Sequence, residues 1–397
     1  MIITAVETLR IAEFPNLLWV IIEDEDGQRG TGESFFSAPA TDAYVHDTAA
    51  QMLIGQDARN REAIRKILHP YVGYNGAGAE VRGNSAIDMA LWDLWGRHLN
   101  QPVWRLLGGR SRERIRTYNT CAGYRYVRGG VGQKTDNWGL GDAEGPYEDL
   151  DGFLSDAGKV AESLLSQGIT GMKIWPFDYA ATESNGAAIT PAQLAEAIEP
   201  FRKIRDAVGD QMQIMAEMHL LWQPHAMAEI ARALEPFDIY WIEDPMPATA
   251  FSSWSDLRRQ VRPKIAGSET MASRAAFRAM MEAQAVDVVI MDLGWCGGLT
   301  EAKAIADMAD AFHLPIAPHD CTGPLAWAAC TNLTINAPNA LVQESVRAFY
   351  TGWYNELATG LPVLEDGHLH LPEGSGMIAE LKPEVFDRAD ATRRRTE

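Results

Sequence analysis

Three glutamates, each at the end of a short apolar run, are regularly spaced in the middle of the chain. Glu217, Glu243 and Glu269 are separated by two intervals of 26 residues (243 − 217 and 269 − 243). This interval accommodates one strand, one helix and two loops, so we expect a βα repeat that brings all three side chains to one end of a barrel. Converging carboxylates repel one another unless a cation joins them. Oxygen ligands favour a hard divalent ion, Mg²⁺ first.

Other polar residues stand at the ends of similar runs and are expected at the same mouth. A carboxylate at the end of one strand can orient an imidazole at the end of the next, which leaves the other ring nitrogen free to accept a proton. Asp292 and His319 have this relation. The remaining strand-end residues are Lys173, His219, which follows Glu217 by two positions, and Glu344.

The elements that must position these residues change in character along the chain. Residues 1–10 and 17–23 alternate as strands do, and helical spacing follows over 41–53, 60–68 and 84–98, which indicates an α+β module. From about residue 116, apolar strands alternate with helices, and eight strand candidates are what a (β/α)₈ TIM-type barrel requires. The eight strands are predicted over 116–121, 171–175, 213–217, 239–243, 264–269, 286–292, 315–319 and 340–344.

The resulting division is residues 1–115 for the α+β module, 116–354 for the barrel and 355–397 for a return to the module. A hairpin turn is expected at Asp366-Gly367. The Gly-rich stretch 125–151 is long enough to be a lid over the barrel mouth. Residues 392–397, which include three consecutive arginines, are expected to be a frayed tail.

Composition excludes several classes of protein. The formal charge of −19 argues against a nucleic-acid or anionic-membrane partner, because such surfaces select Lys and Arg. The chain has no 18-residue apolar stretch and no charged segment leading into a signal peptide, so a cytoplasmic location is expected. Its four cysteines form no C-x-x-C pair and are expected to be reduced thiols.

In the order and spacing of its motifs, nearly the whole chain resembles the mandelate racemase subgroup of the enolase superfamily. The motifs are residues 85–93 (SAIDMALWD), 241–245 (WIEDP), 267–269 (GSE), Asp292 before 297–301 (GGLTE), 318–319 (PH) and 343–345 (QES). The resemblance implies that the α+β module is a capping domain. It further implies that Glu217, Glu243 and Glu269 bind Mg²⁺, that His319 with Asp292 is the base pair, and that the protein is a dimer or an octamer.

The resemblance also implies the reaction type: a proton α to a carboxylate is removed, and Mg²⁺ stabilises the resulting enediolate. Mg²⁺, Lys173 and a protonated carboxyl or other donor at Glu344 would each stabilise the dianion more than the ground state.

Two departures from the subgroup's usual motifs narrow the range of reactions that we expect. Relatives that racemise commonly carry Lys-x-Lys at the end of the second strand, whereas Trp175 occupies the second position here. Indole cannot accept a proton from carbon, so racemase or epimerase activity is not favoured. The segment Glu217-Met218-His219 resembles the Asp-x-His arrangement of galactonate and mannonate dehydratases, which implies that His219 protonates a leaving hydroxyl.

The sequence therefore predicts a Mg²⁺-dependent lyase that dehydrates an acid sugar, an aldonate or aldarate, to a 2-keto-3-deoxy acid. Three alternatives are a cycloisomerase of an anhydro-sugar acid that uses the same site, an epimerase, and a catalytically silent scaffold protein. Specificity is expected in capping loops around residues 14–18, 35–40 and 71–78 and in the lid, while Trp175 and Trp295 are candidates for an apolar wall against the substrate.

Overall fold

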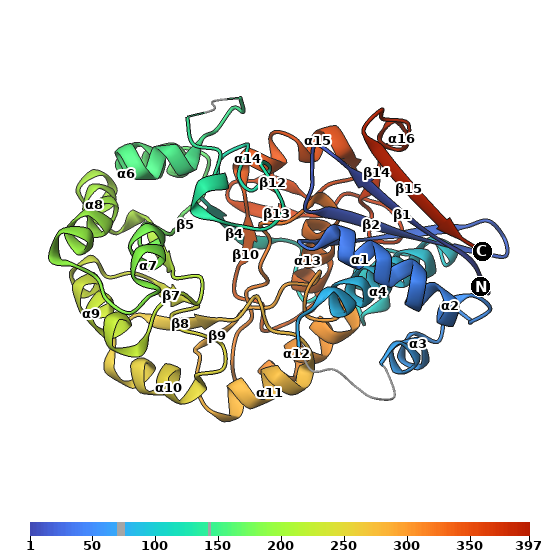
Figure 1. Ribbon diagram of the computed structural model, residues 1–397, viewed down its shortest axis with the longest axis horizontal. Coiled ribbons are helices and arrows are strands. Elements are labelled where there is room, and N and C mark those ends of the chain that lie inside the picture. The colour runs from blue at the N-terminus through green and yellow to red at the C-terminus, as the bar shows by residue number, and fades with distance from the viewer. Residues whose placement is uncertain (70–75, 142–143) are drawn as a thin grey trace.

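The two ends of the chain meet in one antiparallel sheet, which forms the capping domain at the right of Figure 1. The computed structural model describes residues 1–69, 76–141 and 144–397. The strand order in this sheet is β15-β1-β2-β3. The strands are β1 (Ile3–Ile11), β2 (Leu17–Asp24), β3 (Arg29–Phe35) and β15 (Ala391–Thr396).

One long helix, α4 (Ala79–His98), packs on β3, and its residues 85–94 are buried on all sides of the helix. The approach is close because β3 carries glycines at the contact: a Cβ on Gly32 would lie 1.9 Å from the Ala86 carbonyl oxygen. The other elements of this domain are α1 (Ala38–Tyr44), a π-helical turn over Val45–Ala49, α2 (Ala50–Leu53), α3 (Arg61–Leu68) and α5 (Val103–Leu106).

The prediction of a frayed C-terminal tail is wrong. Residues 391–396 form β15, which pairs antiparallel with β1, so that Thr396 faces Val6 and Ala391 faces Ile11. The arginines that suggested a solvated tail find acidic partners on the sheet: Arg393 donates to Glu7 at 2.6 Å and Arg395 to Glu23 at 3.0 Å. An arginine-rich edge strand also discourages pairing with another chain.

A parallel barrel forms the larger part of the molecule, at the left of Figure 1. Strands follow one another around it from β4 to β9, and β10 closes the ring by pairing in parallel with β4. The strands are β4 (Ile115–Thr120), β5 (Gly171–Ile174), β6 (Gln213–Glu217), β7 (Trp241–Glu243), β8 (Lys264–Gly267), β9 (Val288–Val289) and β10 (Gln343–Ser345).

Helices surround the barrel, and its interior is filled by apolar side chains such as Met215, Trp241 and Val288. This is the (β/α)₈ barrel with an N-terminal capping domain that the sequence predicts. The helices are α6 (Asp149–Leu165), α7 (Asp178–Ser184), α8 (Pro191–Val208), α9 (Pro224–Leu234), α10 (Phe251–Gln260), α11 (Arg274–Glu282), α12 (Leu299–Ala311) and α13 (Pro324–Asn336).

The strand predicted over residues 315–319 is reduced to single bridges. Ile316 bridges to Val289 on one side and to Ala340 on the other, and His319 bridges to Asp292. Pro315 and Pro318 explain the difference, because proline has no N–H to donate to a ladder. The barrel is nevertheless closed at this point.

The C-terminal return begins on the barrel and ends on the capping domain. Residues 363–370 form the predicted hairpin, with Asp366 and Gly367 in left-handed conformations, and its second strand pairs with β4 of the barrel. This part of the predicted return therefore lies on the barrel sheet, whereas β15 joins the capping domain. The remaining elements are β12 (Val363–Glu365), β13 (His368–His370), α14 (Arg347–Tyr350), α15 (Tyr354–Leu357), β11 (Ala358–Thr359), β14 (Glu380–Leu381) and α16 (Pro383–Phe386).

The lid predicted over residues 125–151 contains a short 3₁₀ turn at Thr135–Asn137, and α6 begins at Asp149. Of the predicted capping loop 71–78, residues 71–75 lie outside the described residues. Among the helices that the structure describes, none combines the length and the apolar character needed to cross a bilayer.

Candidate active site

Three strand ends bring Glu217, Glu243 and Glu269 together at the carboxyl end of the barrel. One oxygen from each lies within 4.8 Å of the others, and all three residues are buried. Burial and the neighbouring carboxylates raise the pKa of Glu243 and Glu269. Burial also acts to raise the pKa of Glu217, but His219 and Lys173 lower it below its ordinary value. Oε2 of Glu217 makes no hydrogen bond within the described part of the chain. A buried set of three carboxylates with a free oxygen fits a divalent cation of the Mg²⁺ type.

Lys173 lies among these carboxylates. Its Nζ is 2.7 Å from Oε1 of Glu243, 3.0 Å from Oε1 of Glu344 and 3.5 Å from Oε2 of Glu217. Burial alone would lower the pKa of this lysine, but the surrounding carboxylates raise it well above its ordinary value. Lys173 is therefore a fixed positive charge at the mouth, suited to pair with a substrate carboxylate.

The predicted pair of Asp292 and His319 forms with good geometry. Nδ1 of His319 is 2.7 Å from Oδ2 of Asp292, and the other carboxylate oxygen accepts from the Gly294 amide at 2.6 Å. With Nδ1 held in this way, Nε2 points to the site and lies 3.3 Å from Oε2 of Glu269. Burial lowers the pKa of His319, whereas Glu269, Glu344 and Asp292 together raise it above its ordinary value. A cation held by the glutamates would offset part of this increase.

His219 also has a carboxylate partner. Its Nδ1 is 2.8 Å from Oδ2 of Asp178, the first residue of α7, and its Nε2 is 3.4 Å from Nε2 of Gln133 in the lid. Burial would lower the pKa of His219, but Asp178 and Glu217 raise it to about 9. The site thus contains two imidazole–carboxylate pairs, and both histidines line the same pocket.

Both predicted tryptophans line the pocket in which these groups meet. The Trp295 ring lies 5.1 Å from that of His319 and its Nε1 donates to the Phe35 carbonyl at 3.0 Å, while Trp175 lies 6.0 Å from His219. The complete lining is Phe36, Thr120, Tyr126, Val127, Gln133, Lys173, Trp175, His219, Glu269, Trp295, His319, Cys321 and Glu344.

Glu344 is ionised in this environment, whereas a protonated carboxyl or another donor was expected at this position. Although burial raises its pKa, Lys173, His319, a Thr120 hydroxyl and the Asp320 amide lower it to about 2. An ionised Glu344 accepts hydrogen bonds and does not donate them. Its place beside Lys173 instead fixes the ammonium group, so Lys173 is the donor at this side of the pocket.

Sequence reasoning missed Asp178 and the lid residues Tyr126 and Gln133. The signal for Asp178 was present, because it follows the end of strand β5 by four residues, at the start of α7 (178 − 174). Tyr126 and Gln133 carried no such signal, since nothing in their spacing shows which lid residues turn inward. Gln133 reaches the hydroxyl of Tyr126 at 2.5 Å.

The capping loop over residues 14–18 holds the lid through one side chain. The buried Asn16 donates to the carbonyls of Val127 and Gly130, at 2.7 and 3.0 Å, and accepts from the Gly132 amide at 2.8 Å. These bonds keep the first half of the lid over the pocket, so that Tyr126 and Gln133 face His219.

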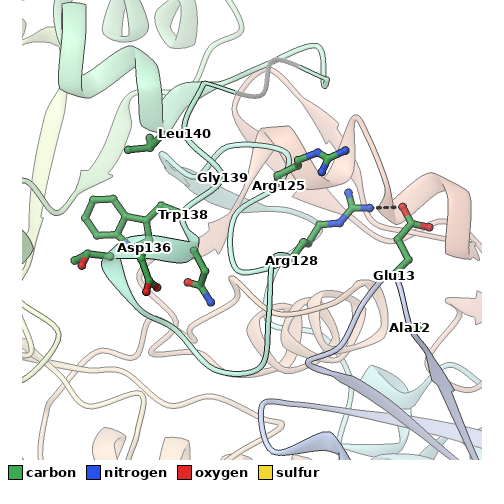
Figure 2. A pocket seen from close by; sticks show the side chains of 11 residues that line it. Ala12, Glu13, Arg125, Arg128, Asp136, Trp138, Gly139 and Leu140 are labelled. Atoms are coloured by element: carbon green, nitrogen blue, oxygen red, sulfur yellow. Dashed lines mark hydrogen bonds and ion pairs between the residues drawn. The ribbon is translucent and has the colours of Figure 1, made fainter.

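A larger surface pocket lies on the outer side of the lid, where it meets the turn after β1 (Figure 2). Its two arginines are already engaged: Arg128 is paired with Glu13, as the dashed line in Figure 2 shows, and Arg125 is paired with Glu144. None of the strand-end residues of the barrel lines this pocket. The Arg128–Glu13 ion pair at this pocket attaches the lid to the capping domain. The candidate catalytic residues lie at the barrel mouth instead.

The chain matches two family profiles that cover most of its length. Residues 2–108 match the mandelate racemase / muconate lactonizing enzyme N-terminal domain, and residues 156–385 match the enolase C-terminal domain-like family. A solved enolase of the mandelate racemase subgroup from Agrobacterium tumefaciens is 44% identical, covers 100% of this chain and 99% of its own, and superposes with a TM-score of 0.88.

Two further structures are similar over their full lengths. An enolase protein from environmental sequencing of the Sargasso Sea is 40% identical, covers 100% of this chain and 98% of its own, and has a TM-score of 0.88. A protein from Zymomonas mobilis, assigned provisionally as a dehydratase, is 25% identical, covers 100% and 99%, and has a TM-score of 0.85. This chain belongs to the enolase superfamily, in its mandelate racemase subgroup. Members of this superfamily are enzymes that bind Mg²⁺ through acidic residues.

Proposed function

We propose that this protein is a Mg²⁺-dependent acid-sugar dehydratase, which removes water from an aldonate or aldarate to give a 2-keto-3-deoxy acid. The observation that carries the proposal is the presence of two imidazole–carboxylate pairs, His319 with Asp292 and His219 with Asp178, at one pocket beside Lys173. β-Elimination of water needs both a base for C2 and an acid for the C3 hydroxyl. The similar protein from Zymomonas mobilis is assigned provisionally to the same class of reaction.

The base step falls to His319. Asp292 accepts a hydrogen bond from Nδ1–H of the neutral imidazole, which leaves the Nε2 lone pair to take the C2 proton. As the C2–H bond breaks, its electron pair moves toward the carboxylate, where Lys173 compensates the added charge. Mg²⁺ bound by Glu217, Glu243 and Glu269 would supply further neutralisation of that carboxylate.

The acid step falls to His219. Asp178, which accepts from Nδ1 at 2.8 Å, raises the pKa of His219 and favours the imidazolium form, which can give the Nε2 proton to a leaving hydroxyl. The C3–O bond then breaks as the C2–C3 double bond forms, water leaves, and the enol tautomerises to the 2-keto acid. Gln133, which approaches Nε2 of His219, is in place to hold the leaving hydroxyl.

The two histidines, His319 and His219, also support a second candidate function, which is epimerisation at C2. Trp175 excludes a lysine base on the side opposite His319, but His219 lies beside that indole and has its own carboxylate. An imidazole on each side of a planar enediolate would return the proton with inversion. Epimerisation and dehydration differ in whether the C3–O bond breaks, so the product distinguishes them.

The deciding experiment incubates the enzyme and Mg²⁺ with a library of aldonates and aldarates in deuterated water. Dehydration yields a 2-keto acid lighter than the substrate by one water, followed by mass spectrometry and NMR. Asp178→Asn should reduce 2-keto acid formation and leave deuterium exchange at C2 measurable, and His313→Asn, at an exposed histidine away from the pocket, serves as the matched control. Inversion at C2 with unchanged mass would replace dehydratase by epimerase, and no exchange with any acid sugar would refute both functions.

A further inference from the structure

Two consecutive barrel helices lack an N-cap side chain of their own. The N-cap positions of α12 and α13 are Gly298 and Gly323, neither of which has a side chain that could accept a hydrogen bond from the first-turn amides. The first amides of a helix have no partner within it, and Ser, Thr, Asp or Asn normally supplies the acceptor. In this molecule the acceptors come from the capping domain.

Glu33, near the end of β3, caps α13. Its carboxylate accepts from the Ala326 amide at 2.9 Å, from the Leu325 amide at 3.3 Å and from the Trp19 indole at 2.7 Å, and it is fully buried. A Cβ on Gly323 would lie 2.3 Å from this carboxylate, so glycine makes room for it.

Asp88, on α4, caps α12 in the same way. It accepts from the Thr300 amide at 2.8 Å and from the Thr300 hydroxyl at 2.5 Å, while the neighbouring Ser85 hydroxyl accepts from the Gly297 amide at 3.0 Å. Gly298 has a φ of +90°, and a Cβ there would lie 2.5 Å from the Asp88 side chain. The two caps therefore depend on glycine at the same relative position.

The loops immediately before these two helices carry the base pair. Asp292 precedes α12 by seven residues and His319 precedes α13 by five (299 − 292 and 324 − 319). Strand β3 contacts the first loop directly, because the Ser34 hydroxyl donates to the Gly294 carbonyl at 3.3 Å and Trp295 donates to Phe35. Gly294 in turn holds Asp292 through its amide.

We propose that Glu33 and Asp88 are positioning residues, through which the capping domain supplies the N-caps of α12 and α13 and thereby fixes Asp292 and His319 in their hydrogen-bonded geometry. The inference rests on the proposed role of His319 as the base. Neither acid touches the pocket lining, so both act through the helices and the loops before them. In the sequence, the motif over residues 85–93 indicated only a family resemblance. Its residues Ser85 and Asp88 accept the hydrogen bonds at the start of α12.

The test compares Glu33→Ala, Asp88→Ala and Asp88→Asn with wild type. Glu33→Ala and Asp88→Ala each remove the N-cap acceptor, so both should lower kcat for C2 exchange by about 10- to 100-fold, the cost of a small misplacement of a catalytic group. KM and the calorimetric Mg²⁺ affinity should change less than about threefold, since the metal site lies on other strands. Asp88→Asn keeps an N-cap acceptor and should restore most of the activity.

Glu7→Ala is the matched control, because Glu7 is a buried carboxylate of the same sheet that pairs with Arg29 and Arg393 and caps neither helix. Equal loss of kcat in this control, or no recovery in Asp88→Asn, would overturn the proposal in favour of general destabilisation.

A second measurement needs no substrate. Amide hydrogen exchange followed by mass spectrometry should show faster exchange over residues 292–302 in Asp88→Ala and over 319–328 in Glu33→Ala, with the glutamate strands unchanged. If wild type exchanges no acid-sugar proton, the proposed function fails, and this measurement alone decides the capping role. Unchanged exchange in both loops would refute it.

Discussion

Glu33 links the stability of the protein to pH in a direction that can be calculated. Burial raises the pKa of this carboxyl from 4.5 to about 7, although three N–H donors oppose the increase. A group whose pKa is higher in the folded state than in the unfolded state stabilises the fold at low pH, and this contribution is lost as pH rises through the folded pKa. The wild-type protein should therefore lose stability from this group as the pH rises from about 4.5 to 7.

Glu33→Gln removes the titration and keeps the size of the side chain. A shift of about 2.5 pKa units corresponds to ~3 kcal/mol in full, of which ~2.5 kcal/mol falls between pH 5 and pH 8. Protonated glutamic acid and glutamine are close analogues, so the two proteins should have similar free energies of unfolding at pH 5. At pH 8 the variant should be more stable than wild type by roughly 2–3 kcal/mol.

Urea denaturation at pH 5, 6, 7 and 8, followed by circular dichroism, measures this difference. Glu23→Gln is a control in the same sheet: its interaction with Arg395 lowers the pKa of Glu23, so that carboxylate stays charged and the control should show a flat difference over this range. A Glu33→Gln difference that is equally flat, or that grows toward low pH, would show that Glu33 is not held with a raised pKa.

Three further outcomes follow from the site. Exhaustive chelation should abolish C2 exchange, Mg²⁺ should restore it, and Glu243→Gln should lower both metal affinity and rate; full activity with no metal found by elemental analysis would refute the metal site. His319→Asn should lower dehydration and C2 exchange together, by about 10²–10⁴-fold, whereas His219→Asn should slow dehydration while exchange persists; equal loss of exchange would leave His319 as the sole acid and base. With Trp175 as the residue opposite His319, NMR in deuterated water should show one C2 configuration consumed and no inversion, and deuterium incorporated with inversion would identify His219 as a second base.

The strand-end residues were predictable because periodicity alone places them. Equal spacing of Glu217, Glu243 and Glu269 requires equal units, and parallel strands in a barrel present their ends on one face. The pairing of Asp292 with His319 was predicted because both residues stand at the ends of successive strands. In the structure, Nδ1 of His319 lies 2.7 Å from Oδ2 of Asp292. Such agreement depends only on strand register, which the apolar runs determine.

Contacts between distant segments were not predictable. The second histidine–carboxylate pair depends on Asp178 in a helix 41 residues from His219, and the N-cap of α13 depends on Glu33, 293 residues from Ala326. The tail over residues 392–397 was misjudged for a related reason, since three arginines resemble a solvated tail until their acidic partners on β1 and β2 are seen. Local composition does not encode such partners.

The pairing of β1 with β15 makes the barrel an insertion within the capping domain (Figure 1). The chain passes from cap to barrel before β4 and returns to the cap before β15, so the two parts are tethered at two places. Strand β15 completes a sheet that β1 began, and this pairing can form only after the barrel between them has been made. The cap is tethered twice, and its residues Glu33 and Asp88 also cap the N-termini of two barrel helices. It therefore cannot detach without disturbing the barrel. We therefore expect cap and barrel to unfold in one cooperative transition, with coincident curves for Trp fluorescence and far-ultraviolet circular dichroism.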